Sequence, residues 1–212
     1  HGDKEMRNTI QAYHGLSDLA DMLALVRARP RELMLCFPSP ADLHELVNVQ
    51  DNPELICLWR AADERLVGFA ILNSGDTYAS LVMECPAQEL QSGLGDLMIA
   101  WAESIFRSSY HGQATSLSAS AEENDSARIE LLERHGFIRL DEETVSMERA
   151  LGEDIPQPEL PAGFMIRPLL GEAEIPAWVA LHQAAFGTEN MTEGYRRVMA
   201  QSPGYDPTLD LV

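Results

Sequence analysis

The chain has 212 residues, of which 45% are hydrophobic and 23% are charged, a composition typical of folded globular proteins and enough for one large domain or one and a half. Its formal net charge is −19 and its 15 Lys and Arg residues are scattered, which argues against a nucleic acid partner, because phosphate binding needs clustered basic residues. The sequence holds no 18-residue apolar run and opens without a secretion signal, so we expect a cytoplasmic protein with no membrane partner.

Two helices are predicted near the start of the chain, before a series of strands. Ser39 suits the N-cap of the second helix and Pro40 suits its first position. From about residue 54 the apolar period changes from 3.6 to 2, and residues 62–64 are short enough to join two strands as an antiparallel hairpin. The expected elements are strand 8–13, helix 17–29, helix 39–48 and strands 54–61, 65–72 and 77–84.

The next part of the chain predicts helices alternating with strands. A helix over 94–107 would place one apolar stripe, formed by Leu94, Leu97, Met98, Trp101 and Ile105, against the sheet. A half-buried strand follows over 113–120, then a helix over 125–135 that ends at Gly136, and a last strand over 144–151. The order βααβββαβαβ predicts an α/β layered sheet with helices on its faces.

After residue 150 the sequence changes character. Residues 151–162 carry three prolines and three acidic residues, which is typical of a stiff, solvated linker. Residues 163–186 then repeat the pattern of residues 7–28, a short strand, a polar turn and an apolar-striped helix, so residues 163–212 predict the beginning of a second domain. We expect a fragment of a longer tandem protein; the alternative is that this tail packs on the first domain or on a neighbouring molecule.

The sequence predicts no metal site and no covalent nucleophile. Cys36, Cys57 and Cys85 show no CxxC spacing, and we interpret them as small buried hydrophobic residues. The six histidines include no HxH or HExxH pair, and His135 suits the C-terminal end of a helix dipole better than catalysis. No GxSxG or Cys/His arrangement is present.

One stretch predicts an anion site. The strand that ends at Glu84 leads through Pro86 to Gly93-Leu94-Gly95, where a helix begins. Free amides at a helix N-terminus bind phosphate well, and glycines there permit close approach and positive φ. The pattern alone is also common in ordinary turns; it lacks the third glycine of a Rossmann fingerprint and the GK[ST] of a Walker A loop.

The strand order, the loop "SGLGDLM" (92–98) and the helix "DSARIELLERHGF" (125–137) together resemble the GCN5-related N-acetyltransferase (GNAT) superfamily over residues 6–150, with a second copy beginning after 163. The resemblance implies an α/β (α+β) fold with a mixed, mainly antiparallel sheet flanked by helices, and acetyl-CoA as co-substrate. By position, the pyrophosphate of coenzyme A would be surrounded by Ser92, Gly93, Leu94, Gly95 and Asp96. The pantetheine arm would pair with the backbone of Val82, Met83 and Glu84, and Asp125 takes the place of a usual Asn.

The family resemblance also implies a direct reaction, in which a neutral amine attacks the thioester and a backbone amide near Met83 or Glu84 stabilises the oxyanion. This sequence departs from the family pattern at several positions. Leu90 replaces the usual Gln or Arg, one extra residue lies between Pro86 and Gly93, and Leu132 falls where a tyrosine usually protonates the leaving thiolate. Tyr78, Tyr110 or a water molecule are candidate replacements, and the catalytic residue stays unknown.

Two functions follow from these residues. The first is an acetyl-CoA-dependent N-acyltransferase that acts on a small-molecule or peptide amine, with a homodimer among the expected partners. The second is a catalytically degenerate domain that binds coenzyme A, or nothing, and acts as a scaffold or regulator; Leu90 and Leu132 favour it. Glu122 and Glu123 would attract a cationic amine, although acidic residues in a loop are usually only solvated.

Overall fold

The computed structural model describes residues 8–30, 36–50, 52–74, 78–109, 116–141, 144–145, 147, 150, 152, 156 and 158–212. The chain forms two compact units, one of His1–Phe137 with Gln201–Gly204 and the other of Ile138–Ala200 with Tyr205–Val212. Each unit is described by itself.

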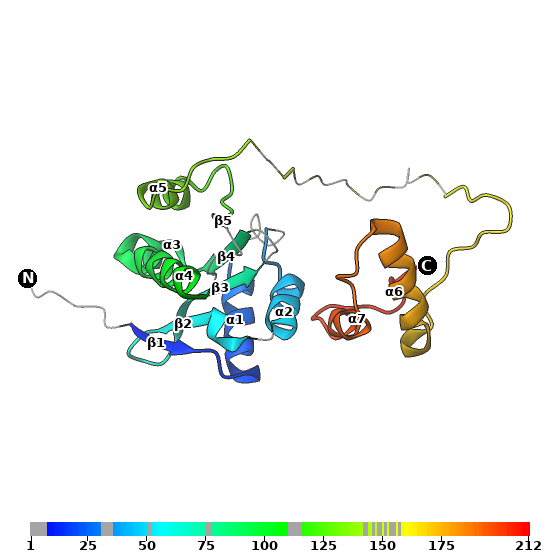
Figure 1. Ribbon diagram of the computed structural model, residues 1–212, viewed down its shortest axis with the longest axis horizontal. Helices are drawn as coiled ribbons and strands as arrows, with labels where there is room; N and C mark the ends of the chain where they lie inside the picture. Colours follow the sequence, from blue (N-terminus) through cyan, green and yellow to red (C-terminus); the bar gives the residue numbers. More distant parts are fainter. Residues whose placement is uncertain are drawn as a thin grey trace, which may run out of the picture. The chain divides into compact units, whose positions relative to one another are not determined.

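The first unit is built on a five-stranded sheet with the order β1-β2-β3-β4-β5 (Figure 1). Its first four strands pair antiparallel, whereas β4 and β5 pair parallel. The strands are β1 Thr9–Ala12, β2 Ile56–Arg60, β3 Leu66–Ser74, β4 Tyr78–Glu84 and β5 Ser116–Ala119, with a short 3₁₀ turn, η2 Pro53–Leu55, before β2. The predicted mixed, mainly antiparallel sheet is therefore confirmed.

One face of the sheet is covered by α1 Leu16–Arg27 and α2 Pro40–Val49. The predicted start of α2 is confirmed, because the Ser39 side chain accepts a hydrogen bond from the Asp42 amide and the Asp42 carboxylate accepts one from the Ser39 amide. The apolar core of this layer comprises Leu19, Met22, Val26, Leu43, Val47, Ile56, Leu58, Leu66, Phe69, Ile71 and Val82.

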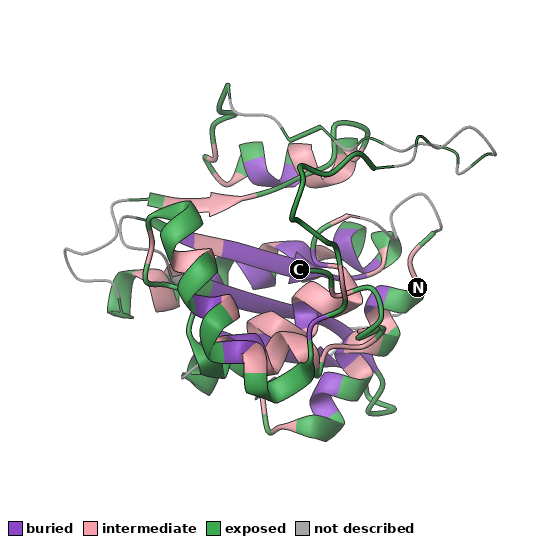
Figure 2. Cartoon of the chain, turned by 90° about the vertical axis from the view of Figure 1, so that its right-hand side faces the viewer, coloured by how far each residue is buried: buried purple, intermediate pink, exposed green. Residues whose placement is uncertain are grey.

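The opposite face is covered by α4 Gly95–Ser109 and α5 Ser126–Arg134. The predicted stripe of α4 is wrong only at Leu97, which is 50% exposed, whereas Gly95, Ile99 and Ala102 are buried in addition. The other four predicted residues are buried or packed against this core: Leu94, Met98, Trp101 and Ile105. With helices on both sides, every residue of β2 is buried, and Figure 2 shows burial concentrated in the sheet and on the inner sides of its helices.

The last predicted strand of this unit does not form in the part of the chain that the structure describes. Thr144, Val145, Met147 and Ala150 lie outside any strand, and the other residues of 144–151 fall outside the described residues. Val145 is 72% exposed and Met147 is 91% exposed. Strand 113–120 is confirmed in its second half as β5.

The second unit contains two helices beside one pair of extended segments. A short 3₁₀ turn, η4 Gly171–Glu174, leads into α6 Ile175–Phe186, and α7 Glu193–Ala200 follows. Arg167 and Val212 exchange two backbone hydrogen bonds, of 3.0 and 2.8 Å, and Leu169 donates to Asp210 at 2.8 Å, so the two ends of the unit pair antiparallel. The second unit thus consists of an extended segment, two helices and a second extended segment that pairs antiparallel with the first. The elements β1, α1, α2 and β2 of the first unit follow the same order.

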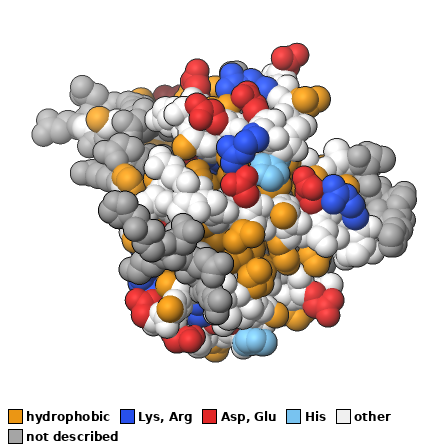
Figure 3. Space-filling model, turned by 90° about the vertical axis from the view of Figure 1, so that its left-hand side faces the viewer, with side chains coloured by type: hydrophobic (Ala, Val, Ile, Leu, Met, Phe, Trp, Pro, Cys, Tyr) orange, Lys and Arg blue, Asp and Glu red, His pale blue; other side chains and the backbone are white. Residues whose placement is uncertain are grey.

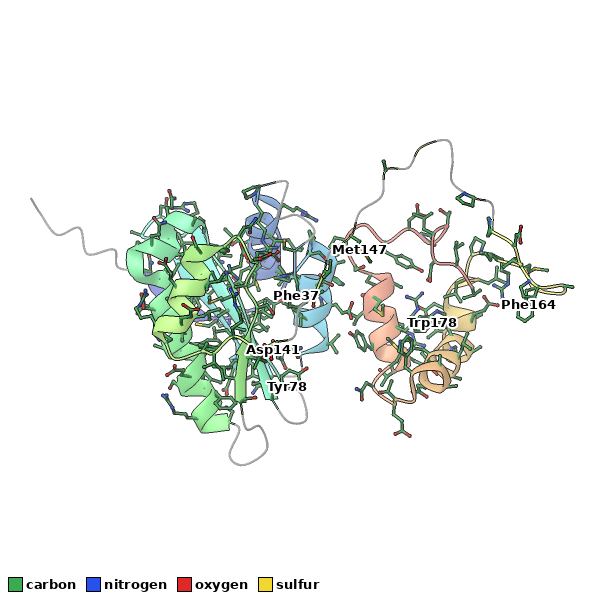
Figure 4. All side chains as sticks on the ribbon, turned by 90° about the horizontal axis from the view of Figure 1, so that it is seen from above. Phe37, Tyr78, Asp141, Met147, Phe164 and Trp178 are labelled. Carbon is green, nitrogen blue, oxygen red and sulfur yellow. The ribbon has the colours of Figure 1, made fainter. Side chains whose placement is uncertain are left out.

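Between α6 and α7 lies a small mixed core. Ile175 and Val179 are buried, and Trp178 points between the two helices (Figure 4). The guanidinium of Arg196 lies 4.5 Å from the centre of the Trp178 ring and forms an ion pair with Asp210. Trp178 is partly buried and packs against this core, and its ring also contacts the buried cation of Arg196.

The interpretation of the three cysteines as small buried residues is confirmed for Cys57 and Cys85 and not for Cys36. Cys57 and Cys85 are buried, and burial raises the pKa of each thiol to about 12. Cys36 is only partly buried. Among the described helices, none combines the length with the apolar composition that a membrane span requires. On the face shown in Figure 3, acidic and basic side chains are interspersed around an apolar area.

Candidate functional site

Beyond the middle of the sheet, β4 and β5 part. The two strands pair from Tyr78 with Ser116 to Leu81 with Ala119, where β5 ends. β4 continues for three more residues, Val82, Met83 and Glu84, which pair only with β3 on the other side. Within the described residues, the β5-facing edge of these three residues therefore has no strand partner, and it is the edge where the resemblance to the GNAT superfamily would place the pantetheine arm.

Met83 presents its peptide groups to this free edge. Nη1 of Arg128, on α5, donates a hydrogen bond of 3.2 Å to the Met83 carbonyl. In an antiparallel ladder the N–H and C=O of one residue lie on the same edge of the strand, so the Met83 N–H shares the edge with its carbonyl. A donor and an acceptor of β4 are thus available where the strands part.

The end of β4 is fixed by a buried ion pair. The carboxylate of Glu84 accepts a hydrogen bond from Arg29, and the two side chains are 9% and 8% exposed. Nη1 of Arg29 also donates to the carbonyls of Cys36 and Pro38, at 3.0 and 2.9 Å. One guanidinium thus fastens the segment before α2 to the last residue of the strand.

The predicted phosphate loop is more helical than the sequence indicates. α3 Ala87–Glu89 leads directly into η3 Leu90–Leu94, a π-helical turn that is kinked at Gly93, and α4 begins at Gly95 after this kink. In a π-helix each amide bonds to the carbonyl five residues earlier, and such turns are frequent at functional sites. The helix predicted to begin at this loop therefore starts after the kink at Gly93, and its first residues, Leu94 and Gly95, are buried. Their contact with a phosphate stays a prediction.

The two glycines of the loop have different roles. Gly93 has φ of +99°, and a side chain there would meet no atom within 4 Å, so this residue bends the chain and faces open space. A Cβ on Gly95 would lie 2.5 Å from Cδ2 of Leu131 and 2.9 Å from Cδ1 of Leu90. Gly95 therefore permits close packing of α4 against α5, rather than access for a phosphate. Of the five predicted loop residues, Ser92, Gly93 and Asp96 reach the surface.

Asp96 links the two helices that flank the loop. Its Oδ1 lies 2.8 Å from Nη2 of Arg134 and 2.8 Å from Nε2 of His135, both at the C-terminal end of α5. The hydrogen bond from Arg134, and next the one from His135, lower the pKa of the Asp96 carboxyl below its ordinary value. His135 thus pairs with an acidic side chain at a helix C-terminus, as its position in the sequence suggests.

Replacing Asp96 with Asn should produce a small, pH-dependent loss of stability. A depressed pKa stabilises the folded state above the ordinary value of 3.8, and the contribution disappears as the pH falls through the lower folded value. Because Asp96 is 43% exposed, we expect Asp96→Asn to cost roughly 0.5–1 kcal/mol at pH 7 and progressively less as the pH falls below 3.8. Urea unfolding at pH 7 and at a series of acidic pH values measures this, with Asp63→Asn as the control; a loss that does not shrink as the pH falls contradicts it.

The helix that carries the remaining family positions is well formed. The side chain of Asp125 caps α5 by accepting a hydrogen bond of 3.1 Å from the Arg128 amide. Leu132 is 7% exposed and packs in the core between α5 and the sheet, so its interpretation as a core residue is confirmed. Tyr78 lies at the far end of β4 from Glu84 (Figure 4), six residues or roughly 20 Å along the strand, too far to replace the usual acid. Tyr110 lies outside the described residues.

Sequence reasoning missed the two arginines of this site. Arg29 comes just after α1 and Arg128 belongs to α5, and neither stands in a recognisable motif. Arg128 comes three residues after Asp125 and four before Leu132, so it lies on the same helix face as these two residues. This spacing is the sequence signal that could have identified Arg128 as part of the site. Among the described residues no group of three or more His, Cys, Asp or Glu side chains is placed to hold a metal ion. Glu122, Glu123 and Asn124 border a shallow surface depression before α5.

Comparison with known proteins finds similarity to a curated protein and to solved structures. The chain is 29% identical over 177 residues to a mycothiol acetyltransferase from Salinispora arenicola, and the match covers 80% of this chain and 53% of that protein. A crystal structure of a GCN5-related N-acetyltransferase from Sphaerobacter thermophilus matches with a TM-score of 0.54 at 19% identity, over 95% of this chain and 65% of that one. No family model matches the chain.

These comparisons show the fold. The chain has the mixed α/β architecture of the Sphaerobacter protein, with a mostly antiparallel sheet between helices, as the resemblance to the GNAT superfamily predicted. The chain spans about half the length of the curated relative it matches.

Proposed function

We propose that the first unit binds acetyl-CoA and transfers its acetyl group to an amine of a small molecule or peptide. The observation that carries this proposal is the edge of β4 at Val82, Met83 and Glu84, which has no strand partner on the β5 side among the described residues and is followed, after α3, by the kink at Gly93. Both similar proteins are named as acetyltransferases, and one of them shares the fold.

Each part of the site has one task in this proposal. Val82, Met83 and Glu84 hold the pantetheine arm by backbone hydrogen bonds, and the Met83 amide polarises the carbonyl that is attacked. Ser92 and Gly93 present the kink of the loop to the diphosphate, while Asp96 and Asp125 hold α4 and α5 beside it. The bound thioester supplies the activated acetyl group, and the chain supplies position and electrostatics.

A degenerate, coenzyme-binding domain is the second candidate. Leu132 is buried in the core and carries no proton, and Leu90 is buried as well, at 9% exposure. Neither leucine can donate a hydrogen bond or a proton, as the polar side chain usual at its position in the family would. In this second candidate function the domain binds coenzyme A but does not catalyse acyl transfer.

We also propose that residues 163–212 begin a second copy of the fold, joined by the linker 151–162. The second unit repeats the order of β1, α1, α2 and β2, including the antiparallel pairing of its two extended segments. Exposed apolar side chains support this proposal, because a strand pair normally buries both faces in such a fold; they include Phe164, Met165 and Leu209, each at least 72% exposed.

Calorimetric titration of the full chain with acetyl-CoA tests the cofactor site. The sharpest variant is Ser92→Glu, because Ser92 is exposed and a carboxylate there faces the proposed diphosphate. A like charge at about 4 Å costs on the order of 1 kcal/mol per unit charge, so affinity should fall about tenfold or more. Ala100→Glu, equally exposed on α4, adds the same charge elsewhere and should leave the affinity unchanged.

The outcomes separate the two functions. Absence of any binding by the unmodified chain would remove the cofactor site and acyl transfer, and would leave a scaffold or regulator that binds no coenzyme A. Binding together with release of free thiol in the presence of an amine panel supports acyl transfer. Binding without thiol release favours the degenerate domain. Equal losses in Ser92→Glu and Ala100→Glu would show that the diphosphate lies elsewhere.

A further inference from the structure

Arg128 occupies the face of α5 that lies toward the reacting end of the proposed site. Leu132, where the family resemblance places a tyrosine acid, is four residues later and therefore on the same side of the helix. Leu132 is turned into the core and has no proton to donate. One turn nearer the helix N-terminus, Arg128 reaches the free edge of β4 instead.

The guanidinium of Arg128 is well placed but only partly engaged. Its side chain is 18% exposed, and Nη1 donates to the Met83 carbonyl at 3.2 Å, which is at the long end for a hydrogen bond. Its buried Nε lies 3.4 Å from Oδ2 of Asp125 and makes no hydrogen bond. A permanently charged group with spare donors thus stands where β4 and β5 part.

We propose that Arg128 stabilises the thiolate of coenzyme A as it leaves, in place of a tyrosine that would protonate it. This inference rests on the proposed function. In the step, a bond forms between the amine nitrogen and the acetyl carbon, the carbon–sulfur bond breaks, and sulfur keeps the bonding pair as a thiolate beside the guanidinium. The proton lost by the nitrogen passes to water. No proton is taken from Arg128, which remains charged.

Several titratable groups surround Arg128 and set the field that the sulfur would experience. Asp125 caps α5 and Glu122 lies in the loop before it, and Glu84 and the Cys85 thiol lie at the end of β4. Glu89 of α3 and Cys36 of the segment before α2 also belong to this group. Glu84 is paired with Arg29, so Asp125 is the acid that acts most directly against Arg128. The guanidinium still lies nearest to the edge that would hold the thiol.

The first test measures the acidity of bound coenzyme A. Thiolate absorbance is titrated against pH for coenzyme A bound to the full chain, with the protein's own thiols subtracted from a titration of the free chain. A nearby cation stabilises the thiolate, so the bound thiol should be about tenfold more acidic in the unmodified chain than in Arg128→Gln. Arg107→Gln on α4, where Arg107 is 73% exposed, removes a charge elsewhere and should change nothing. Equal acidity in the unmodified chain and Arg128→Gln overturns the proposal.

The second test follows turnover. Arg128→Gln should lower kcat about 10²-fold, as loss of one electrostatic donor does in other acyl transfer sites, and change the KM for acetyl-CoA little. The kcat of the unmodified chain should not fall as the pH approaches 10, whereas Arg128→Lys should lose activity as its amine titrates near about 10.4. An unchanged kcat in Arg128→Gln overturns the proposal.

The two failures are distinguishable. If coenzyme A does not bind, the proposed function fails and the inference fails with it. If coenzyme A binds and its thiol has the same acidity with and without Arg128, the inference alone fails. A thiol made more acidic by Arg128 in a chain without turnover supports the inference and assigns the missing activity to another part of the site.

Discussion

Glu84→Ala should destabilise the first unit by roughly 3–5 kcal/mol, because it leaves the Arg29 guanidinium buried without its carboxylate. Nη1 of Arg29 would keep its hydrogen bonds to the carbonyls of Cys36 and Pro38, but Nη2 would lose its partner and the charge would not be neutralised. Urea unfolding of the full chain, followed by circular dichroism and Trp fluorescence, measures the loss as a lower midpoint.

The double variant Arg29→Met with Glu84→Met is the matched control. It removes both charges and fills much of the same space, so it should cost less than Glu84→Ala or Arg29→Met alone. A single-variant loss below about 1 kcal/mol would mean that the pair behaves as a surface ion pair, contrary to its burial.

Trp59→Ala is expected to cost a similar amount, roughly 3–5 kcal/mol, for a different reason. Trp59 lies on β2, is fully buried, and meets the ring of Trp101 edge to face at 6.1 Å between ring centres. Truncation leaves a cavity between the sheet and α4 that neighbouring side chains cannot fill. Thermal and urea unfolding monitored by circular dichroism test this, and we expect a visibly lower midpoint in both.

Two variants show whether the cavity is the cause. Trp59→Phe keeps an aromatic ring and removes an indole N–H that has no hydrogen-bond partner among the described residues, so it should cost about 1 kcal/mol or less. Trp101→Ala breaks the same ring contact from a partly buried position and should cost less than Trp59→Ala. If Trp101→Ala costs as much as Trp59→Ala, the ring contact outweighs the cavity.

These two predictions also relate stability to the proposed site. Glu84 ends the strand whose edge would hold the cofactor, and Trp59 supports the layer under α4. Variants of either residue should therefore be compared with Ser92→Glu, which is exposed and is expected to change affinity without changing stability. If Ser92→Glu lowers the affinity for acetyl-CoA and leaves the unfolding midpoint unchanged, the loss of affinity comes from the binding site itself and not from a less stable fold.

The sequence alone determined most of the local structure. Ser39 and Pro40 identified the start of α2, the short connection at residues 62–64 identified the hairpin, and Gly136, with φ of +83°, was correctly expected to end α5. Each of these depends on the conformation and hydrogen bonds of a few adjacent residues, and the adjacent residues are known from the sequence.

Only the tertiary structure decided which residues meet across the site. Arg29 reaches Glu84 over 55 residues and Arg128 reaches Met83 over 45, and no local pattern marks either contact. Gly95 was correctly singled out, but its role depends on Leu131 of another helix, and the exposure of Leu97 depends on how α4 is rotated on the sheet. The orientation of packed helices follows from the shape of both partners, whereas local sequence describes only one.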